Sequence, residues 1–283
     1  MMGRTPLTMN VRGDLWSFSV PKVMGILNLT PDSFYAASRV QTEAEIARRA
    51  EQLVVEGAEI IDVGACSTRP GADVPDADEE ARRLRRGLAV VRRIVPQAVV
   101  SVDTFRAEVA RMCVEEFGAD MINDVSGGEA DAAMFGMAAR LHVPYVVTHI
   151  KGSPKTMQQS PQYEDVVCEV LEVLSRKVAA LHALGINDVV VDPGFGFGKR
   201  LDDNYRLMRH LRRFKLLGCP VLVGVSRKSM VQSLLGIGSE EALNGTTALH
   251  AVALMLGADI LRVHDVRAAL EAVKVVGKVM TSV

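Results

Sequence analysis

Eight short apolar segments, separated by longer stretches with helical spacing, constrain the fold of this chain more than any other feature of its sequence. The segments read 23-VMGILN, 60-IIDVG, 98-AVVSVD, 120-DMINDV, 144-PYVVTH, 188-DVVVDPG, 221-VLVGVS and 259-DILRVH. Each is almost continuously apolar rather than alternating. This pattern indicates strands of a parallel sheet that are buried on both faces.

The stretches between these segments carry the signals of amphipathic helices. One begins after Thr42, with Glu45 three residues later as in a capping box, and ends near Gly57. Another has an acidic first turn from Asp76 and is stopped by Pro96. Further helices are predicted over 105–117, 131–141, 162–184, 203–217, 240–256 and 265–281.

Strands that alternate with helices over the whole chain favour a closed barrel over a doubly wound sheet. We therefore predict the α/β class and a single (β/α)8 TIM barrel with eight parallel strands. The barrel domain is expected to span 23–283, which suits a fold of about 250 residues. Residues 1–22 are expected to form an N-terminal extension at the N-terminal side of the barrel, and a short extra helix is expected after Arg227.

Charge and composition exclude several classes of protein. The 33 lysines and arginines balance 34 aspartates and glutamates, so the formal net charge is -1, which argues against a nucleic-acid partner. The sequence has no apolar run of about 18 residues, so no membrane span or membrane partner is expected. The four cysteines lack metal or disulfide spacing, which favours reduced thiols and a cytoplasmic protein.

Polar side chains gather where the predicted strands end, which is the face of such a barrel that carries the active site. They are Asn28, Asp62, Thr68, Arg69, Asp103, Asn123, Asp124, His149, Asp192, Ser226, Arg227, Lys228, Arg262 and His264. Stability alone explains such a set poorly, because each buried polar group needs a partner.

This set separates into two chemical halves. Asp103, Asn123 and Asp192 suit a flat heterocycle with N–H donors along one edge, because a carboxylate accepts two such donors at once. The cationic half, which suits a phosphate or diphosphate, consists of Arg69, Lys228, Arg262 and His264. Asn28 offers a neutral oxygen to a hard cation such as Mg2+, which usually also bridges phosphate oxygens.

Several strings in the order of the chain resemble the dihydropteroate synthase family. They are 24-MGILNLTPDSF, 67-STRPG, 100-VSVDT, 122-INDVSG, 191-VDPGFGFGK, 226-SRKS and 261-LRVHDV. The resemblance implies a transferase, a homodimeric (β/α)8 barrel of folate biosynthesis. Such an enzyme condenses 7,8-dihydropterin-6-ylmethyl diphosphate with p-aminobenzoate, releases diphosphate and is inhibited by sulfonamides.

The resemblance also implies roles for residues of this chain. The pterin would be held by Asp103, Asn123, Asp192 and Lys228, with the Arg262 guanidinium stacked on its ring. Diphosphate and Mg2+ would be handled by Asn28, Thr68, Arg69, Arg262 and His264. The aminobenzoate would be enclosed by Phe34, Pro70, Phe197 and Ser229. The residues expected to act in catalysis are Arg69, Lys228, Arg262 and His264.

The first loop departs from the family pattern, which leaves a second hypothesis open. It reads 35-YAASRV where the family usually continues Ser-Asp-Gly-Gly, and 64-GACSTRPG replaces a Gly and a Glu with Ala65 and Cys66. A pterin-binding paralogue with weak or no synthase activity is therefore the alternative. A pterin-dependent methyltransferase is a third reading, which STRPG, SRKS and the Arg262–His264 pair disfavour because no diphosphate would need holding.

Some polar residues also have simple structural interpretations. The glycines of 194-GFGFGK do not match a phosphate loop or a dinucleotide fingerprint, so they predict a tight loop that lets the backbone approach the substrate. Lys199 is expected to be a solvated charge, and Asp62 and Asp124 to anchor neighbouring loops. Lys228 as the Schiff-base lysine of an aldolase ranks lower, because it leaves Asn123 unexplained.

Overall fold

The computed structural model describes residues 7–30, 42–66, 74–152 and 161–282. It contains one eight-stranded parallel sheet, in the order β8-β7-β6-β5-β4-β3-β10-β9. The strands are β3 (Lys22–Asn28), β4 (Ile60–Gly64), β5 (Val99–Asp103), β6 (Met121–Asp124), β7 (Tyr145–Thr148), β8 (Val189–Asp192), β9 (Leu222–Val223) and β10 (Ile260–Val263). A parallel bridge between Val191 and Val221 joins the two edges. The predicted (β/α)8 barrel is confirmed.

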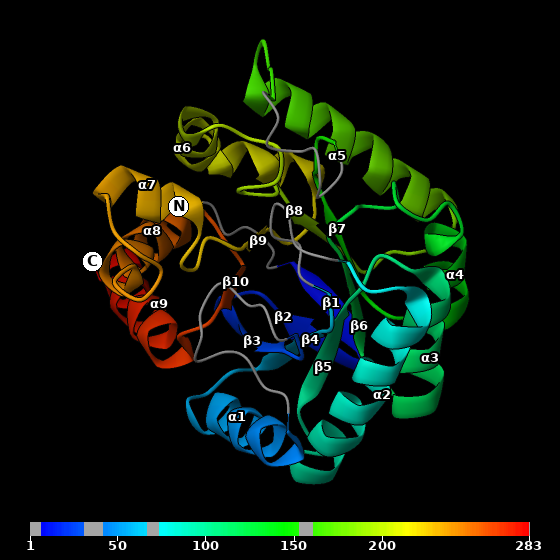
Figure 1. The fold of residues 1–283 in the computed structure, drawn as a ribbon. Helices are drawn as coiled ribbons and strands as arrows, with labels where there is room; N and C mark the ends of the chain where they lie inside the picture. The colour runs from blue at the N-terminus through cyan, green and yellow to red at the C-terminus, as the bar shows by residue number, and fades with distance from the viewer. Residues whose placement is uncertain (1–6, 31–41, 67–73, 153–160, 283) are drawn as a thin grey trace.

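The helices form an outer ring around these strands (Figure 1). They are α1 (Glu43–Val55), α2 (Ala77–Ile94), α3 (Ala107–Phe117), α4 (Met134–Leu141), α5 (Val166–Ala183), α6 (Leu201–Arg209), α7 (Ser229–Leu235), α8 (Leu243–Met255) and α9 (Val266–Thr281). The extra helix expected after Arg227 is α7. The helix predicted over 203–217 is wrong in its second half, because α6 gives way to a 3-10 helix at Leu211–Leu217.

The helix starts follow from their capping residues. The hydroxyl of Thr42 accepts a hydrogen bond from the Glu45 N–H at 3.2 Å, and the Glu45 carboxylate accepts one from the Thr42 N–H at 2.8 Å. This reciprocal pair is the predicted capping box of α1. The Asp76 carboxylate likewise caps α2 through the Glu79 N–H.

The side chains that point into the barrel change character along each strand. In β5 the inward positions run from Val99 through Ser101 to Asp103, and β4 places Ile60 and Asp62 in register with the first two of these. The inward residues at the start of the strands are apolar, and those near the ends are polar. The barrel therefore has an apolar N-terminal half and a polar C-terminal half.

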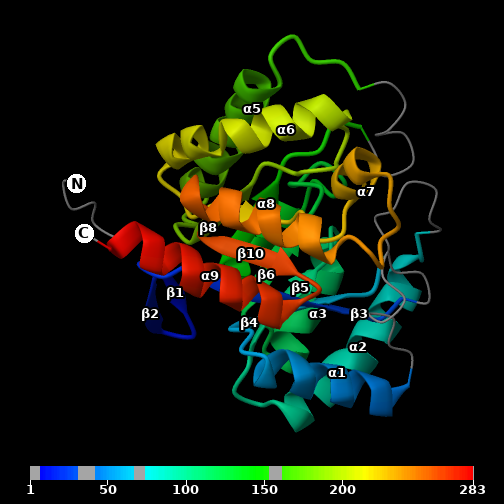
Figure 2. The ribbon, with the colours of Figure 1, turned by 90° about the vertical axis from the view of Figure 1, so that its left-hand side faces the viewer.

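A hairpin closes the apolar end of the barrel. β1 (Thr8–Val11) pairs antiparallel with β2 (Asp14–Ser17), and Met9, Val11 and Phe18 pack in one buried cluster with the first inward residue of every barrel strand. Figure 2 shows this hairpin at one end of the barrel and α7 near the other. The hairpin seals the barrel opposite the ends that carry polar residues.

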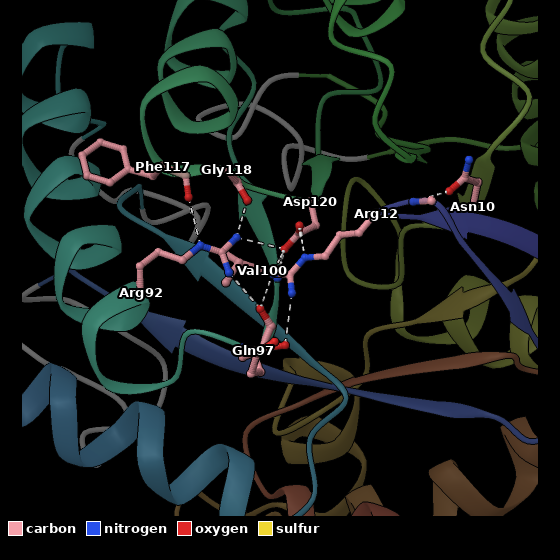
Figure 3. Close-up of polar contacts among 10 residues, drawn as sticks. Asn10, Arg12, Arg92, Gln97, Val100, Phe117, Gly118 and Asp120 are labelled. Carbon is pink, nitrogen blue, oxygen red and sulfur yellow. Dashed lines mark hydrogen bonds and ion pairs between the residues drawn. The ribbon is translucent and has the colours of Figure 1, made fainter.

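Two arginines and a buried aspartate tie the hairpin to the barrel (Figure 3). Arg12 binds both carboxylate oxygens of Asp120, at 2.5 and 2.8 Å, and Arg92 binds the same carboxylate at 2.9 Å. The Val100 N–H also donates to it at 2.7 Å. Asp120 lies before β6 at the N-terminal end of the barrel, so this cluster stabilises the fold and lies away from the strand ends.

Within the described residues, no helix combines the length and the apolar character that crossing a membrane requires.

One buried histidine lies outside the strand ends. His250 of α8 is only 2% exposed, and among the described residues neither ring nitrogen has a hydrogen-bond partner. Burial lowers its pKa to about 4. The unfolded chain, with an ordinary histidine pKa of about 6.5, therefore binds more protons between these values, and the folded state loses stability as the pH falls through this range.

We predict that His250→Leu weakens the pH dependence of stability. The variant should gain about 1 kcal/mol at about pH 8, by removing unpaired polar groups, and roughly 2 kcal/mol more at about pH 5. Urea unfolding at both pH values measures the difference. The interpretation is wrong if parent and variant lose stability in parallel as the pH falls.

Candidate active site

The ends of three strands meet around one guanidinium. Arg262 of β10 donates through Nε to Asp62 Oδ2 of β4 and through Nη2 to Asp103 Oδ2 of β5, each at 2.6 Å. The side chain of Arg262 is 18% exposed, whereas Asp62 is fully buried. Two carboxylates therefore fix the plane of the guanidinium at the C-terminal end of the barrel.

Asp62 is the site residue that the sequence interpretation missed. It was expected to anchor a loop, but its Oδ2 also accepts a hydrogen bond from Asn123 Nδ2 at 3.0 Å, which links two predicted pterin ligands. Its Oδ1 is buried and finds no hydrogen-bond partner within the described ranges. Strand parity could have found it, because Asp62 follows inward-facing Ile60 by two residues.

Asp124, the other aspartate expected to anchor a loop, does so. Its carboxylate accepts hydrogen bonds from the N–H groups of Ser126 and Gly128 and from the Tyr145 hydroxyl. It follows inward-facing Asn123 by one residue and so points to the opposite face of β6.

Burial raises the pKa of both predicted pterin-binding carboxylates. For Asp103 the nearby Arg262 opposes this effect, and for Asp192 the opposing groups are Lys228 and the Gly194 N–H. Asp192 ends β8, and its Oδ1 accepts the Gly194 N–H at 2.7 Å. These carboxylates are desolvated acceptors, which suits recognition of N–H donors.

Lys228 lies against the aromatic residue Phe197, and the charge of Asp192 acts on its ammonium. Its Nζ donates to the Phe195 carbonyl at 2.6 Å and lies 4.4 Å from the centre of the Phe197 ring. Burial lowers the pKa of Lys228 to about 8, and Asp192 opposes the shift. Ser229, the first residue of α7, is exposed. Lys228 and Phe197 thus meet, as expected for neighbouring parts of one site.

His264 departs from its expected charge. It is buried, and its N–H and Nδ1 both lie 3.1 Å from the Ser226 hydroxyl. Burial, reinforced by the charge of Arg262, lowers its pKa to about 3. The expectation of a cationic His264 is therefore wrong. At neutral pH it is an uncharged imidazole beside Arg262.

Arg227 lies next to Lys228 and connects three segments of the chain. It is buried, forms a bidentate ion pair with Asp265 at 2.8 and 3.0 Å, and donates to the carbonyls of Ser239 and Glu240. It therefore ties the end of β9 to the loop before α8 and to the start of α9.

Two other expectations concern the loop after β8. Lys199, expected to be a solvated charge, is 2% exposed, so that expectation is wrong. Gly194 and Gly198 have φ values of +72° and +63°, and a Cβ there would lie 1.9 Å from the His149 carbonyl and 2.3 Å from the Lys151 carbonyl. These glycines therefore let the loop approach the chain that follows β7.

Asn28 fits a magnesium ligand of the expected kind. It ends β3 with a half-buried amide, which supplies a hard oxygen donor. No group of three or more histidine, cysteine, aspartate or glutamate side chains suited to a metal occurs in the part of the chain that the structure describes. Mg2+ commonly takes few protein ligands and completes its shell with phosphate oxygens and water. Phe34, Thr68, Arg69 and Pro70 lie outside the described residues.

Comparison with known proteins decides the family. Residues 24–264 match the family described as pterin binding enzyme. Dihydropteroate synthase of Escherichia coli (strain K12) is 41% identical over 94% of each chain. The chain belongs to the dihydropteroate synthase family. It is therefore a pterin-binding transferase of folate biosynthesis.

Solved structures of this family agree with the fold. Xanthomonas albilineans dihydropteroate synthase with 4-aminobenzoic acid superposes with a TM-score of 0.87 at 40% identity, over 99% of this chain and 100% of that one. The Yersinia pestis dihydropteroate synthase in a sulfonamide drug complex gives a TM-score of 0.91 at 36% identity, over 98% and 100%. Nothing in these similarities supports the alternative of a paralogue without synthase activity.

We predict that Asp62→Asn lowers kcat/KM for the pterin substrate on the order of 10-fold to 100-fold, because Arg262 loses one of its two carboxylate partners. Steady-state kinetics measure the loss. Asp124→Asn is the matched control, because it removes an equally buried charge that does not contact Arg262. Equal losses in the two variants would contradict the role of Asp62.

Proposed function

We propose that this chain joins p-aminobenzoate to 7,8-dihydropterin-6-ylmethyl diphosphate, giving 7,8-dihydropteroate and diphosphate, with the residues at the strand ends in the roles described below. The observation that carries these roles is the convergence of Asp62 and Asp103 on Arg262, with Asn123 bonded to Asp62. Acceptors that surround a planar cation suit a flat, donor-rich ring with an anionic substituent.

The pterin would be recognised by the desolvated acceptors and by Lys228. Asp103, Asn123 and Asp192 lie at or near the ends of β5, β6 and β8, and the Arg262 guanidinium offers a flat surface for the ring. The aminobenzoate would lie beside Phe197 and Ser229 and, in the first two loops, Phe34 and Pro70. A sulfonamide resembles this arylamine, so we expect it to compete there.

The reaction breaks the bond between the pterin methylene carbon and a diphosphate oxygen. The lone pair of the arylamine nitrogen forms the new C–N bond, the bonding pair leaves with diphosphate, and the nitrogen then loses a proton. Negative charge grows on the leaving group, where Arg262, Arg69 and Thr68 would stabilise it, with His264 as an uncharged hydrogen-bonding group. Asp103 and Asp192 would stabilise positive charge on the pterin.

Magnesium would be held through Asn28 and the substrate's diphosphate. When bound, it would offset negative charge on the departing diphosphate. Asn28 itself would orient that end of the substrate over the barrel, beside the next strand end at Gly64, whose carbonyl accepts the Leu29 N–H at 2.8 Å.

The net charge and the cysteines bear on the class of partner and on the compartment. The net charge of -1 favours small-molecule substrates over nucleic acid. All four cysteines are free thiols, which supports the reducing cytoplasm as the compartment.

Helices α8 and α9 pack against one another. A homodimer would use the apolar side chains that the two helices leave exposed. The apolar residues of helix α8 are not confined to one face, a property typical of a helix covered on more than one side. Exposed apolar side chains on the two helices are Leu243, Val252, Met255, Val275, Val279 and Met280. Exposed apolar side chains on two neighbouring helices are typical of an interface between copies.

The synthase reaction is tested with purified protein, both substrates and Mg2+. We expect diphosphate release that requires both substrates, and Arg262→Ala should lower kcat by roughly 100-fold to 1000-fold, because charge on the leaving group loses a preorganised donor. Arg111→Ala, on the exposed face of α3, is the control. Tight pterin binding without release would instead favour the paralogue, and an Arg262→Ala enzyme with unchanged turnover would contradict the role of Arg262.

The dimer is tested by replacing Val275 and Val279 together with glutamate. These residues are 64% and 62% exposed on one face of α9, so the charges should convert a dimer to a monomer in sedimentation experiments. Val55→Glu, at a more exposed position of α1, should leave the dimer intact. A double variant that sediments as the parent does would exclude this face.

A further inference from the structure

The loop between β8 and α6 encloses a lysine that the proposed reaction does not use. Lys199 Nζ lies 2.8 Å from the Gly194 carbonyl, 3.0 Å from the Phe197 carbonyl and 2.9 Å from Nδ1 of His149. An ammonium has three N–H groups, and these three contacts use all of them. A fourth acceptor, the His149 carbonyl, lies at 3.3 Å.

Burying the ammonium of Lys199 costs free energy, so its retention indicates a specific use. Burial lowers the pKa of Lys199 to about 7, although Asp192 opposes the shift, and lowers that of His149 to about 2. A buried charge is weak support for stability, because an apolar side chain of similar volume often does as well. The contacts of Lys199 instead constrain where the loop lies.

Other hydrogen bonds hold separate parts of this loop. Gly194, Gly196 and Gly198 all have left-handed φ values, and because glycine has no Cβ the backbone at these positions can also take other conformations. The N–H of Gly196 donates to Asn204 Oδ1 at 2.7 Å, and the Tyr163 hydroxyl donates to the Gly198 carbonyl at 2.8 Å. The Phe197 N–H donates to the Gly194 carbonyl at 3.1 Å, and Lys199 joins both residues to the end of β7 at His149.

The same loop holds three groups of the site. The Gly194 N–H donates to Asp192, the Phe195 carbonyl accepts from Lys228, and the Phe197 ring lies against Lys228 Nζ. A shift of the loop would therefore move Lys228 relative to Asp192 and move the aromatic surface beside it.

We propose that Lys199 is a positioning residue, whose ammonium fixes the loop after β8 so that Lys228 and Phe197 are held for the two substrates. The inference rests on the proposed function, because it assigns Lys199 an effect on substrates through Lys228 and Phe197. His149 is its partner from the neighbouring strand, and accepts through Nδ1 as the neutral ring with its proton on Nε2.

The test compares two buried lysines. Lys199→Met should raise KM for p-aminobenzoate and for the pterin substrate by roughly 10-fold or more, since loss of the clamp displaces Phe197 and Lys228. Lys215→Met is the matched control, because Lys215 pairs with Asp259 at the opposite end of the barrel and is also largely buried. It should lower the unfolding midpoint while both KM values stay within about twofold of the parent.

Chemical rescue separates the ammonium from the fold. Propylammonium supplies the three carbons and the nitrogen that Lys199→Ala lacks, so it should restore low KM values to that variant in proportion to its concentration. It should have no effect on the parent or on Lys215→Ala. Lys199→Met with parental KM values, or losses equal to those of Lys215→Met, overturns the proposal.

Two further variants apply if the Lys199 variants do not fold. His149→Asn keeps an acceptor near the position of Nδ1 and should keep KM near the parental value, whereas His149→Leu removes the acceptor and should raise it. Equal KM values for these two variants overturn the proposal. A parent protein that makes no product contradicts the proposed function itself, whereas an active parent with indifferent variants contradicts only the role of Lys199.

Discussion

The ion pairs of Arg262 with Asp62 and Asp103 are the interactions on which the rest of the site depends. A lone guanidinium inside a barrel would be costly to desolvate, and so would either carboxylate. Held together, the guanidinium and the two carboxylates compensate one another's burial, and the plane of the guanidinium is set by two strands at once. Asn123 is oriented by the same Asp62 oxygen, so ring recognition and charge stabilisation share one support.

The apolar half of the barrel makes this polar half possible. Each strand contributes one inward apolar residue near its start, and Met9, Val11 and Phe18 of the N-terminal segment cover that layer. The outward residues of the strands pack against the helices in a separate cluster. The stability of the fold therefore comes from the outer layer and the closed end of the barrel. The C-terminal ends of the strands can then hold desolvated polar groups, which do not themselves stabilise the fold.

The sequence predicted the architecture well, because strand burial and helix periodicity are local signals. It also predicted that Asp103, Asn123, Asp192, Lys228 and Arg262 would meet, since the ends of parallel strands share one face of a barrel. The interactions of Asp62 and the neutral state of His264 were not predicted, because they arise from neighbours distant in the chain. The loop residues Phe34, Thr68, Arg69 and Pro70, together with the role of Asn28 toward magnesium, stay predictions.

Lys199 and Lys228 illustrate why residue type alone does not predict role. Both are buried lysines with lowered pKa values near the end of β8, and both donate to carbonyls of one loop. The three closest contacts of Lys199 are two carbonyls of the loop and His149, and they use all three N–H groups of its ammonium. No N–H group then remains for a ligand. Lys228 donates to one carbonyl and lies on an aromatic ring, so its ammonium retains N–H groups that a substrate could use. The difference is one of geometry, and it makes the first lysine part of the scaffold and the second part of the site.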